Sequence, residues 1–364
     1  MIQKTIHFQI SENMSYNNRL KCRVFRLTYF CLLIWLSPRA QTSKSAPSDF
    51  PEMDAFLVTN KASFGNNVIA LAYKDGKVVY KKEVEKDIGD FNARVQVPAG
   101  IASQWLVAAT VMAYVDEGKI SLDDKVSKYL TIFSKYMKTY ITIRNCLSFT
   151  TGIHADPPGP LKILEKSKYP DLETEVNAFA AKRDIETNPG TQIFFSQIGP
   201  DIAARVLEVV TKKSFDRCVQ EKILRPCKMR GTSFTNENGF VNNAATGAVT
   251  TANDFINFLG MLLNKGTFDG KKVLSEKSIA EMETIQFPTI PVKYIPKEAA
   301  GLKMGLGCWI ENGATVTSLN MNGFYPYVDR NRNYAAVLIP KKSDEPKKEL
   351  YIVFRGKMDA SFGK

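Results

Sequence analysis

The chain has 364 residues, 44% of them hydrophobic and 24% charged, which suits one large globular domain or two modest ones. Its 22 Phe, 14 Tyr and 3 Trp can build a sizeable core, which excludes a disordered chain, and no internal period indicates a repeat architecture. The formal net charge is +12, but residues 1–40 hold six basic side chains and one acid, and the later charges alternate in sign, so nucleic-acid binding is not expected.

Residues 1–40 have the pattern of an export signal. Four basic residues between positions 19 and 26 precede an apolar run at 27–36, and the small residue Ala40 follows at a plausible cleavage site. The run is shorter than the roughly 20 residues that span a bilayer. We therefore expect cleavage near Ala40, translation from Met1 or Met14, and a periplasmic or secreted product that meets a membrane only through the uncleaved signal. A membrane anchor or a buried helix is the alternative for this run.

A polar linker at 41–51 is expected to lead into one domain at 52–364. Export would leave four cysteines in that domain: Cys146, Cys218, Cys227 and Cys308. An oxidising compartment permits a disulfide, and Cys218 with Cys227 is the one close pair. In a chain this long, four cysteines are more often buried as small apolar side chains. Their spacing matches no zinc signature, and we expect neither a metal nor another cofactor.

The domain begins with a predicted hairpin. Apolar runs at 68–73 and 78–82 flank Asp75-Gly76, a dipeptide typical of a tight turn between two strands. Helices then follow by apolar spacing and capping residues. They are predicted at 103–117, from about 141, at 197–211 and after Thr251.

Strands are predicted again near the end of the chain. The expected segments are 304–310, 324–328, 334–339 and 350–354. Strands at both ends with helices between them predict an α+β domain whose sheet joins the two ends of the chain.

Six stretches occur in a characteristic order. They are VMAYVDEGKISLDDKVSKYL (111–130), ITIRNCLSFTTGI (141–153), PGTQIFFSQ (189–197), GAVTTAND (247–254), GLGCW (305–309) and GFYPYVD (323–329). Together they resemble the serine β-lactamase and penicillin-binding-protein superfamily, in the branch of class C β-lactamases, D-alanyl-D-alanine carboxypeptidases and related esterases. The resemblance covers about residues 52–355. It implies a β-lactamase/transpeptidase-like fold, with an antiparallel sheet from both chain ends flanked by helices, and an all-helical lobe.

The resemblance also implies acyl transfer through a serine ester. A Ser at the start of a helix attacks the carbonyl, and a Lys three residues later, on the same helical face, takes its proton. A Tyr-x-Asn motif relays protons, and a Lys-Thr-Gly or His-x-Gly strand motif lines the other wall.

Each of these motifs has changed in this sequence. Read back from residue 111, the Ser-x-Ser-Lys motif falls on 101–104, so the nucleophile position is Ile101 and the lysine position is Gln104. Isoleucine has no nucleophilic atom, and an amide is no base near neutral pH. The Tyr-x-Asn motif falls on Phe195-Ser196-Gln197, which lacks the phenolic hydroxyl.

The strand motif falls near Ser318-Leu319-Asn320, without a cation, imidazole or glycine. A register shift does not rescue the nucleophile, because Ser103 is followed three residues later by Leu106. We therefore predict a protein of this fold without the family's serine chemistry.

The altered positions still outline a pocket. Its expected lining is apolar and amide-bearing: Ile101, Ser103, Gln104, Phe195, Gln197, Asn320 and Asn322. Such a pocket could bind an unidentified small molecule, a peptide or a cell-wall fragment. The alternative is a filled site in which Ile101 and Phe195 pack as core.

The sequence has two histidines, His7 and His154. Two histidines exclude a multi-histidine metal site, and a Ser-His-Asp triad would need His154. A loop histidine that is solvated or bonded to a backbone carbonyl is the expected state of His154.

Three functions remain open from the sequence. The first is a non-catalytic exported binding protein, and the second is an active serine hydrolase (a β-lactamase, carboxypeptidase or esterase) that uses Ser103 or Ser196. The third is a purely structural or interaction module. The residues do not indicate an oligomeric state.

Overall fold

The computed structural model describes residues 50–85, 89, 91–155, 167–241, 243–318, 323–341 and 348–363. The chain divides into two units, Met1–Ala46 and Pro47–Lys364, and every described residue belongs to the second. The predicted export signal, nearly all of the linker, Asn320 and Asn322 lie outside the described residues. In the part that is described, no helix is long and apolar enough to cross a membrane.

A seven-stranded antiparallel sheet forms the centre of the second unit, in the order β2-β1-β13-β12-β11-β10-β9. Its strands are β1 (Val68–Lys74), β2 (Lys77–Val84), β9 (Lys303–Met304), β10 (Trp309–Glu311), β11 (Thr315–Thr317), β12 (Tyr325–Asp329) and β13 (Tyr334–Pro340). Ala70 of β1 pairs with Leu338 of β13, so the sheet joins the two ends of the domain. This confirms the predicted α+β architecture.

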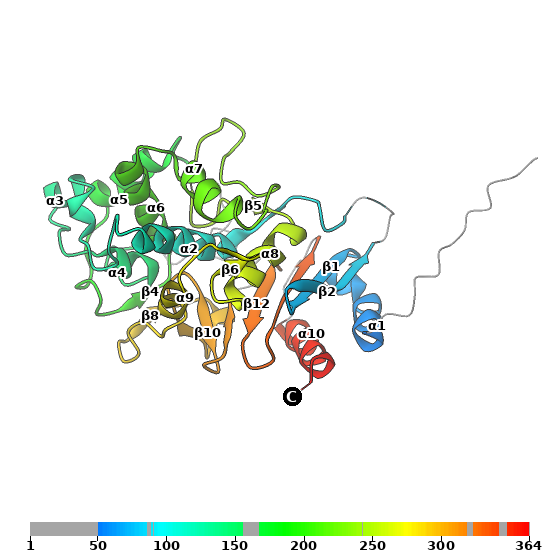
Figure 1. Ribbon diagram of the computed structural model, residues 1–364. Coiled ribbons are helices and arrows are strands. Elements are labelled where there is room, and N and C mark those ends of the chain that lie inside the picture. Colours follow the sequence, from blue (N-terminus) through cyan, green and yellow to red (C-terminus); the bar gives the residue numbers. More distant parts are fainter. Residues whose placement is uncertain are drawn as a thin grey trace, which may run out of the picture. The chain divides into compact units, whose positions relative to one another are not determined.

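The two faces of the sheet are covered by different helices (Figure 1). Alternate residues of a strand point to opposite faces. Ala70 of β1 packs in a cluster with Phe56 of α1 (Pro51–Thr59) and Phe354 of α10 (Lys348–Ser361). Leu71 belongs to the main core with Phe258 of α8 (Ala252–Leu263) and the buried helix α2 (Ser103–Asp116).

The helical lobe lies beside α2 and away from β1 and β2 (Figure 1). It contains α3 (Ile132–Lys135), α4 (Ile143–Leu147), α5 (Leu172–Lys182), α6 (Ile198–Thr211) and α7 (Phe215–Val219). The 3₁₀ turns are η1 (Lys61–Phe64), η2 (Gly100–Ala102), η3 (Val126–Lys128) and η6 (Lys297–Ala299), and a π turn, η5 (Gln220–Leu224), follows α7. The remaining elements are α9 (Glu276–Met282) and the short pairs β3 (Val97–Pro98) with β5 (Val249–Thr250), β4 (Ile193–Phe194) with β8 (Val292–Tyr294), and β6 (Thr267–Phe268) with β7 (Lys271–Lys272).

Local signals account for several elements. Asp75 and Gly76 have φ of 50° and 81°, as the predicted tight turn between β1 and β2 requires. The Thr251 hydroxyl accepts the Asp254 N–H at 3.1 Å and caps α8, as predicted. The helices predicted at 103–117 and 197–211 are α2 and α6.

Two strand predictions are wrong. Residues 350–354 lie inside α10, where Tyr351, Phe354 and Met358 are buried at helical spacing while Ile352 is 61% exposed. The β-branched residues in this segment favoured a strand. The conformation is decided instead by apolar side chains that recur every three to four residues and pack against the sheet. Residues 304–310 are two strands, β9 and β10, because the chain turns at Gly307, which has φ of 67°.

The four described cysteines are buried and free. The Cys218 sulfur lies 3.2 Å from the Thr211 hydroxyl. The expectation that the cysteines act as small apolar side chains is therefore confirmed, and Cys218 and Cys227 are not joined.

Candidate functional site

The first turn of α2 holds the positions where the family's motif falls. Ile101 on η2 and Gln104 on α2 are each 1% exposed, and three residues bring them to one face of the chain. Ser103 is also buried, and its hydroxyl accepts the Ala248 N–H at 3.1 Å. This bond fastens the start of α2 to the loop before β5.

Aromatic rings surround Ile101. It belongs to an apolar cluster with Phe149, Ile193, Phe195, Ala299, Met304 and Trp309. The Phe195 ring centroid lies 4.8 Å from that of Phe149 and 5.8 Å from that of Trp309. The structure thus brings the predicted nucleophile position and the predicted tyrosine position together, in a packed apolar cluster.

The amide side chains of the predicted pocket have different surroundings. The Gln104 side-chain nitrogen is buried without a hydrogen-bond partner among the described residues. The Gln197 side-chain oxygen accepts the Asn243 amide at 2.9 Å, and the Asn243 oxygen accepts the Thr246 N–H at 2.8 Å. Gln197 is therefore part of an amide bridge to the loop before β5.

The strand wall is only partly described. Ser318 is buried, and its carbonyl accepts the Thr317 hydroxyl at 3.0 Å. In the described part of this region, the side chains at 101, 104, 195 and 197 are one aliphatic, one aromatic and two amide groups. These groups can pack and hydrogen-bond, but they supply no nucleophile and no base near neutral pH.

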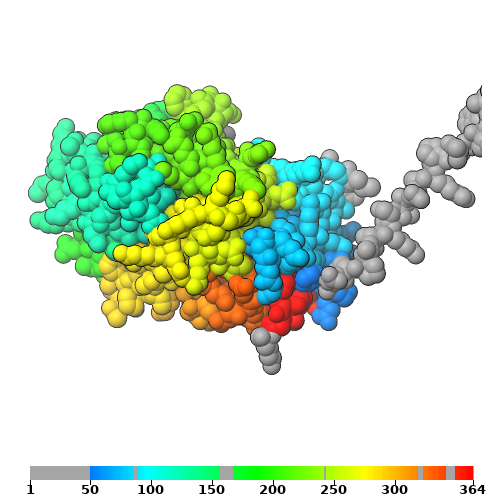
Figure 2. Space-filling model, in the orientation of Figure 1, coloured from blue at the N-terminus to red at the C-terminus, as the bar shows by residue number. Residues whose placement is uncertain are grey.

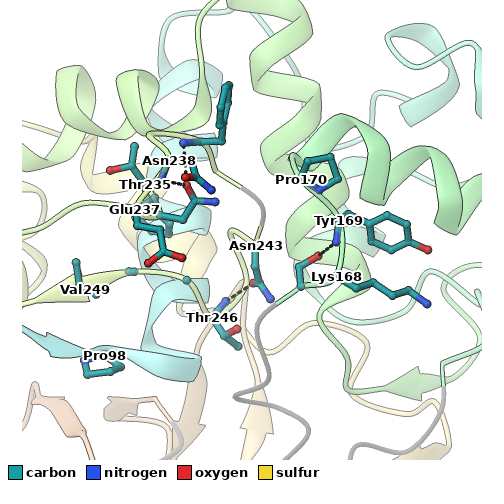
Figure 3. Close-up of a pocket in the computed structure, with 16 residues that line it drawn as sticks. Pro98, Lys168, Tyr169, Pro170, Thr235, Glu237, Asn238, Asn243, Thr246 and Val249 are labelled. Carbon is teal, nitrogen blue, oxygen red and sulfur yellow. Dashed lines mark hydrogen bonds between the residues drawn. The ribbon is translucent and has the colours of Figure 1, made fainter.

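A cavity of about 980 Å³ is lined by Asn243 and Thr246 of the amide bridge, among other residues. Segments 167–170, 234–240 and 243–249 line it together with Pro98. Figure 3 shows Asn243 and Thr246 in the middle, with Glu237 and Asn238 on one side and Lys168 and Tyr169 on the other. Sequence reasoning missed this cavity, although the Asn- and Gly-rich run at 235–243 is a turn signal that could have drawn attention to it.

Two buried carboxyl groups hold the loops that line the cavity. One Asp201 oxygen accepts the N–H groups of Ala244 and Ala245 at 2.7 and 2.9 Å. One Glu175 oxygen accepts the Ser167 hydroxyl at 2.9 Å. The second oxygen of each carboxyl is buried without a partner among the described residues. The two groups thus connect α5 to the segment at 167–170 and α6 to the segment at 243–249, and both segments line the cavity.

The surroundings of this pair favour protonation. Burial raises the pKa of Asp201 well above its ordinary value, and the nearby Glu175 adds to the rise. Burial also raises the pKa of Glu175 to about 7, against the opposing effects of the Ser167 hydrogen bond and Arg183. Nothing in the residue spacing could have revealed the pair, because α5 and α6 meet only in the folded structure.

His154 is bonded to a carboxylate rather than to a backbone carbonyl. Its Nδ1 lies 2.6 Å from Glu186, whose other oxygen lies 2.5 Å from the Lys293 ammonium. Lys293 and then His154 lower the pKa of Glu186. The His154 side chain is 43% exposed. The three side chains form a hydrogen-bonded chain at the surface. Within the described ranges, no three His, Cys, Asp or Glu side chains group as metal ligands.

Comparisons with known proteins agree with the fold. The family model described as Beta-lactamase matches residues 66–352. A protein of Escherichia coli (strain K12) named "Putative D-alanyl-D-alanine carboxypeptidase" is 25% identical over 186 residues, which are 46% of this chain and 43% of that protein. "Protein flp" of Staphylococcus aureus (strain MRSA252) is 24% identical over 188 residues, 49% of this chain and 36% of that protein. The matched part is less than half the length of these curated relatives.

Solved structures match over more of the chain. The "putative beta-lactamase from Bacteroides dorei DSM 17855" has a TM-score of 0.75 at 24% identity, covering 87% of this chain and all of that one. The "octameric penicillin-binding protein homologue from Pyrococcus abyssi" has a TM-score of 0.65 at 20% identity, covering 83% of this chain and 76% of that one. At these identities the likeness establishes the fold alone.

Proposed function

Since the chain belongs to the beta-lactamase family, we propose that it is a member that has lost serine acyl transfer and acts as an exported, non-catalytic binding protein. The observation that carries the proposal is the cluster at the start of α2. Ile101 stands at the nucleophile position and packs with Phe195, which stands at the tyrosine position. A serine ester cannot form on an aliphatic side chain.

The binding half of the proposal rests on the cavity beside Asn243. It is as large as the pockets that take drug-sized ligands, and its walls offer amide, hydroxyl and aromatic groups. An unidentified small molecule, a peptide or a cell-wall fragment of modest size would suit it. The Gln197–Asn243 hydrogen bond links a residue that lines this cavity to the position where the family's Tyr-x-Asn motif falls, which supports this choice of binding site.

The alternative is an active hydrolase with a different nucleophile. Ser103 does not favour it, because its hydroxyl is fully buried and bonded to the Ala248 N–H. Ser196 is partly exposed, and its hydroxyl forms no hydrogen bond with a described side chain that could take its proton. A serine without a base is a weak nucleophile, so no observation supports this alternative.

Turnover assays test the proposal. We expect the purified protein to hydrolyse p-nitrophenyl acetate, a chromogenic cephalosporin and a D-alanyl-D-alanine peptide no faster than a Ser196→Ala variant. A rise in melting temperature with the same peptide, or with an N-acetylated disaccharide, would identify a ligand, since a molecule that binds only the folded state must stabilise it. Turnover that Ser196→Ala abolishes would overturn the loss of catalysis.

A further inference from the structure

The outer end of the helical lobe carries an unusual surface. Residues 125–140, here called the α3 tip, contain four lysines, of which Lys138 is buried, and three tyrosines, but no aspartate or glutamate. Helix α3 and its flanking turns lie at the extreme end of the lobe, far from the sheet (Figures 1 and 2). The tip is therefore a convex projection rather than part of a groove.

Apolar side chains cover the apex of the α3 tip. Met137 is 86% exposed, Tyr140 is 72% exposed and Tyr136 is 37% exposed. Beneath them, Phe133 is fully buried in the main core and holds α3 to the lobe. The apolar groups at the apex thus stand on a fixed base and face solvent.

The backbone presents Met137 outward. Its N–H donates to Ser134, and the Lys138 N–H donates to Phe133, which is the bonding pattern that ends a helix with a left-handed residue. Met137 has φ of 59°, a conformation that glycine adopts without strain. The sequence nevertheless places the most exposed large apolar side chain of the described chain at this position.

The lysines around the apex are available to an anionic partner. The Lys125 ammonium lies 5.4 Å from the Tyr140 ring centroid and that of Lys135 lies 5.6 Å from the Tyr136 ring centroid. Neither lysine forms an ion pair with a described residue. Lys128 differs, because it pairs with Asp124 at 2.9 Å.

We propose that the α3 tip docks the protein on the surface of an anionic phospholipid bilayer. Lysine and tyrosine settle at the headgroup level, where the lysines meet lipid phosphates and the aromatic rings lie at the boundary. Met137 then enters the outer edge of the acyl region. A protein partner would need about 800 Å² and 20–30 residues a side, more than a convex tip of sixteen residues offers.

Vesicle co-sedimentation tests the proposal with residues 41–364, which retain the compact unit Pro47–Lys364 and lack the N-terminal apolar run. Vesicles of phosphatidylglycerol and phosphatidylcholine are compared with pure phosphatidylcholine at low and at physiological salt. Each lysine should contribute about fivefold to the partition coefficient. We expect the double variant Lys125→Glu, Lys135→Glu to lower the partition coefficient at least about twentyfold. The control is Lys271→Glu with Lys272→Glu, which makes the same charge change on the exposed strand β7 and should leave the coefficient within about twofold.

Met137→Gly separates docking from folding. Glycine relieves the left-handed backbone at this position, so the variant should be at least as stable as the parent and still bind anionic vesicles about three- to tenfold more weakly. Equal binding to anionic and neutral vesicles would overturn the proposal. So would an equal loss in the β7 variant, or self-association that Met137→Gly abolishes in the absence of lipid.

Discussion

The buried carboxyl pair makes the stability of this protein depend on pH in a way that one substitution can isolate. Glu175→Gln replaces a buried carboxyl by an amide of the same shape. The amide oxygen can still accept the Ser167 hydroxyl, so the substitution keeps this hydrogen bond and removes the titratable group.

The size of the change in unfolding free energy follows from the pKa of Glu175. Burial raises it from 4.5 to about 7 in the folded protein. The folded state therefore holds the proton more tightly than the unfolded state, and stability falls as the pH rises from about 4.5 through about 7. The loss amounts to about 3 kcal/mol once the pH exceeds 7, since each pKa unit corresponds to about 1.4 kcal/mol.

Urea unfolding at pH 5 and pH 8 measures this effect. We expect Glu175→Gln to be more stable than the parent by up to about 3 kcal/mol at pH 8, and to differ far less at pH 5. Glu173→Gln is the matched control, because Glu173 lies on the same helix with a side chain that is 58% exposed. The control should change the free energy of unfolding by less than about 0.5 kcal/mol at either pH.

The reasoning would be refuted if Glu175→Gln destabilised the protein equally at both pH values. That outcome would mean that Glu175 is ionised in the folded state. An effect as large in Glu173→Gln would assign the pH dependence to the surface charge of α5.

Two substitutions and one labelling reaction test the packing of the buried side chains. Phe195→Ala should lower the free energy of unfolding in urea by about 3–5 kcal/mol, because the ring is buried. Phe240→Ala, whose side chain is 59% exposed, should lower it by less than about 0.5 kcal/mol. A small loss in Phe195→Ala would indicate an open pocket. Gln104→Met should raise the free energy of unfolding by about 1 kcal/mol, because it removes a buried amide nitrogen that has no hydrogen-bond partner among the described residues. A clear destabilisation would show that this amide makes a polar contact. The four buried cysteines should react with a thiol reagent only when the protein unfolds. Burial keeps them as unreactive thiols and raises the pKa of Cys227, for example, to about 12. Rapid labelling of the native protein would contradict this.

Sequence reasoning predicted much of the fold because local signals and packing agreed there. The Asp75-Gly76 turn, the Thr251 cap and the buried stripe of α8 each point to the structure that forms. It failed at α10, where a β-branched run has strand propensity but the pattern of burial is helical. Propensity is a weak guide when the deciding contact is with the sheet, which the local sequence does not reveal.

The site was predictable only as far as the family's motifs reach. Aligning these motifs brought positions 101, 104, 195 and 197 to attention, and the structure places Ile101 and Phe195 in one cluster. The cavity beside Asn243 and the Glu175–Asp201 pair were not predictable, because each is assembled from segments separated in sequence. Whether an altered pocket is open or filled depends on side-chain packing that spacing cannot show.

Intact mass after exposure to acylating reagents shows whether the protein retains a reactive serine. Residues 41–364 are incubated with a fluorescent penicillin and, separately, with a fluorophosphonate, beside an Ile101→Ser plus Gln104→Lys variant that restores the two reactive groups. The account predicts that the unaltered protein keeps its mass with both reagents. A gain of one acyl group by the unaltered protein would contradict the account, and peptide mapping would then name the serine responsible.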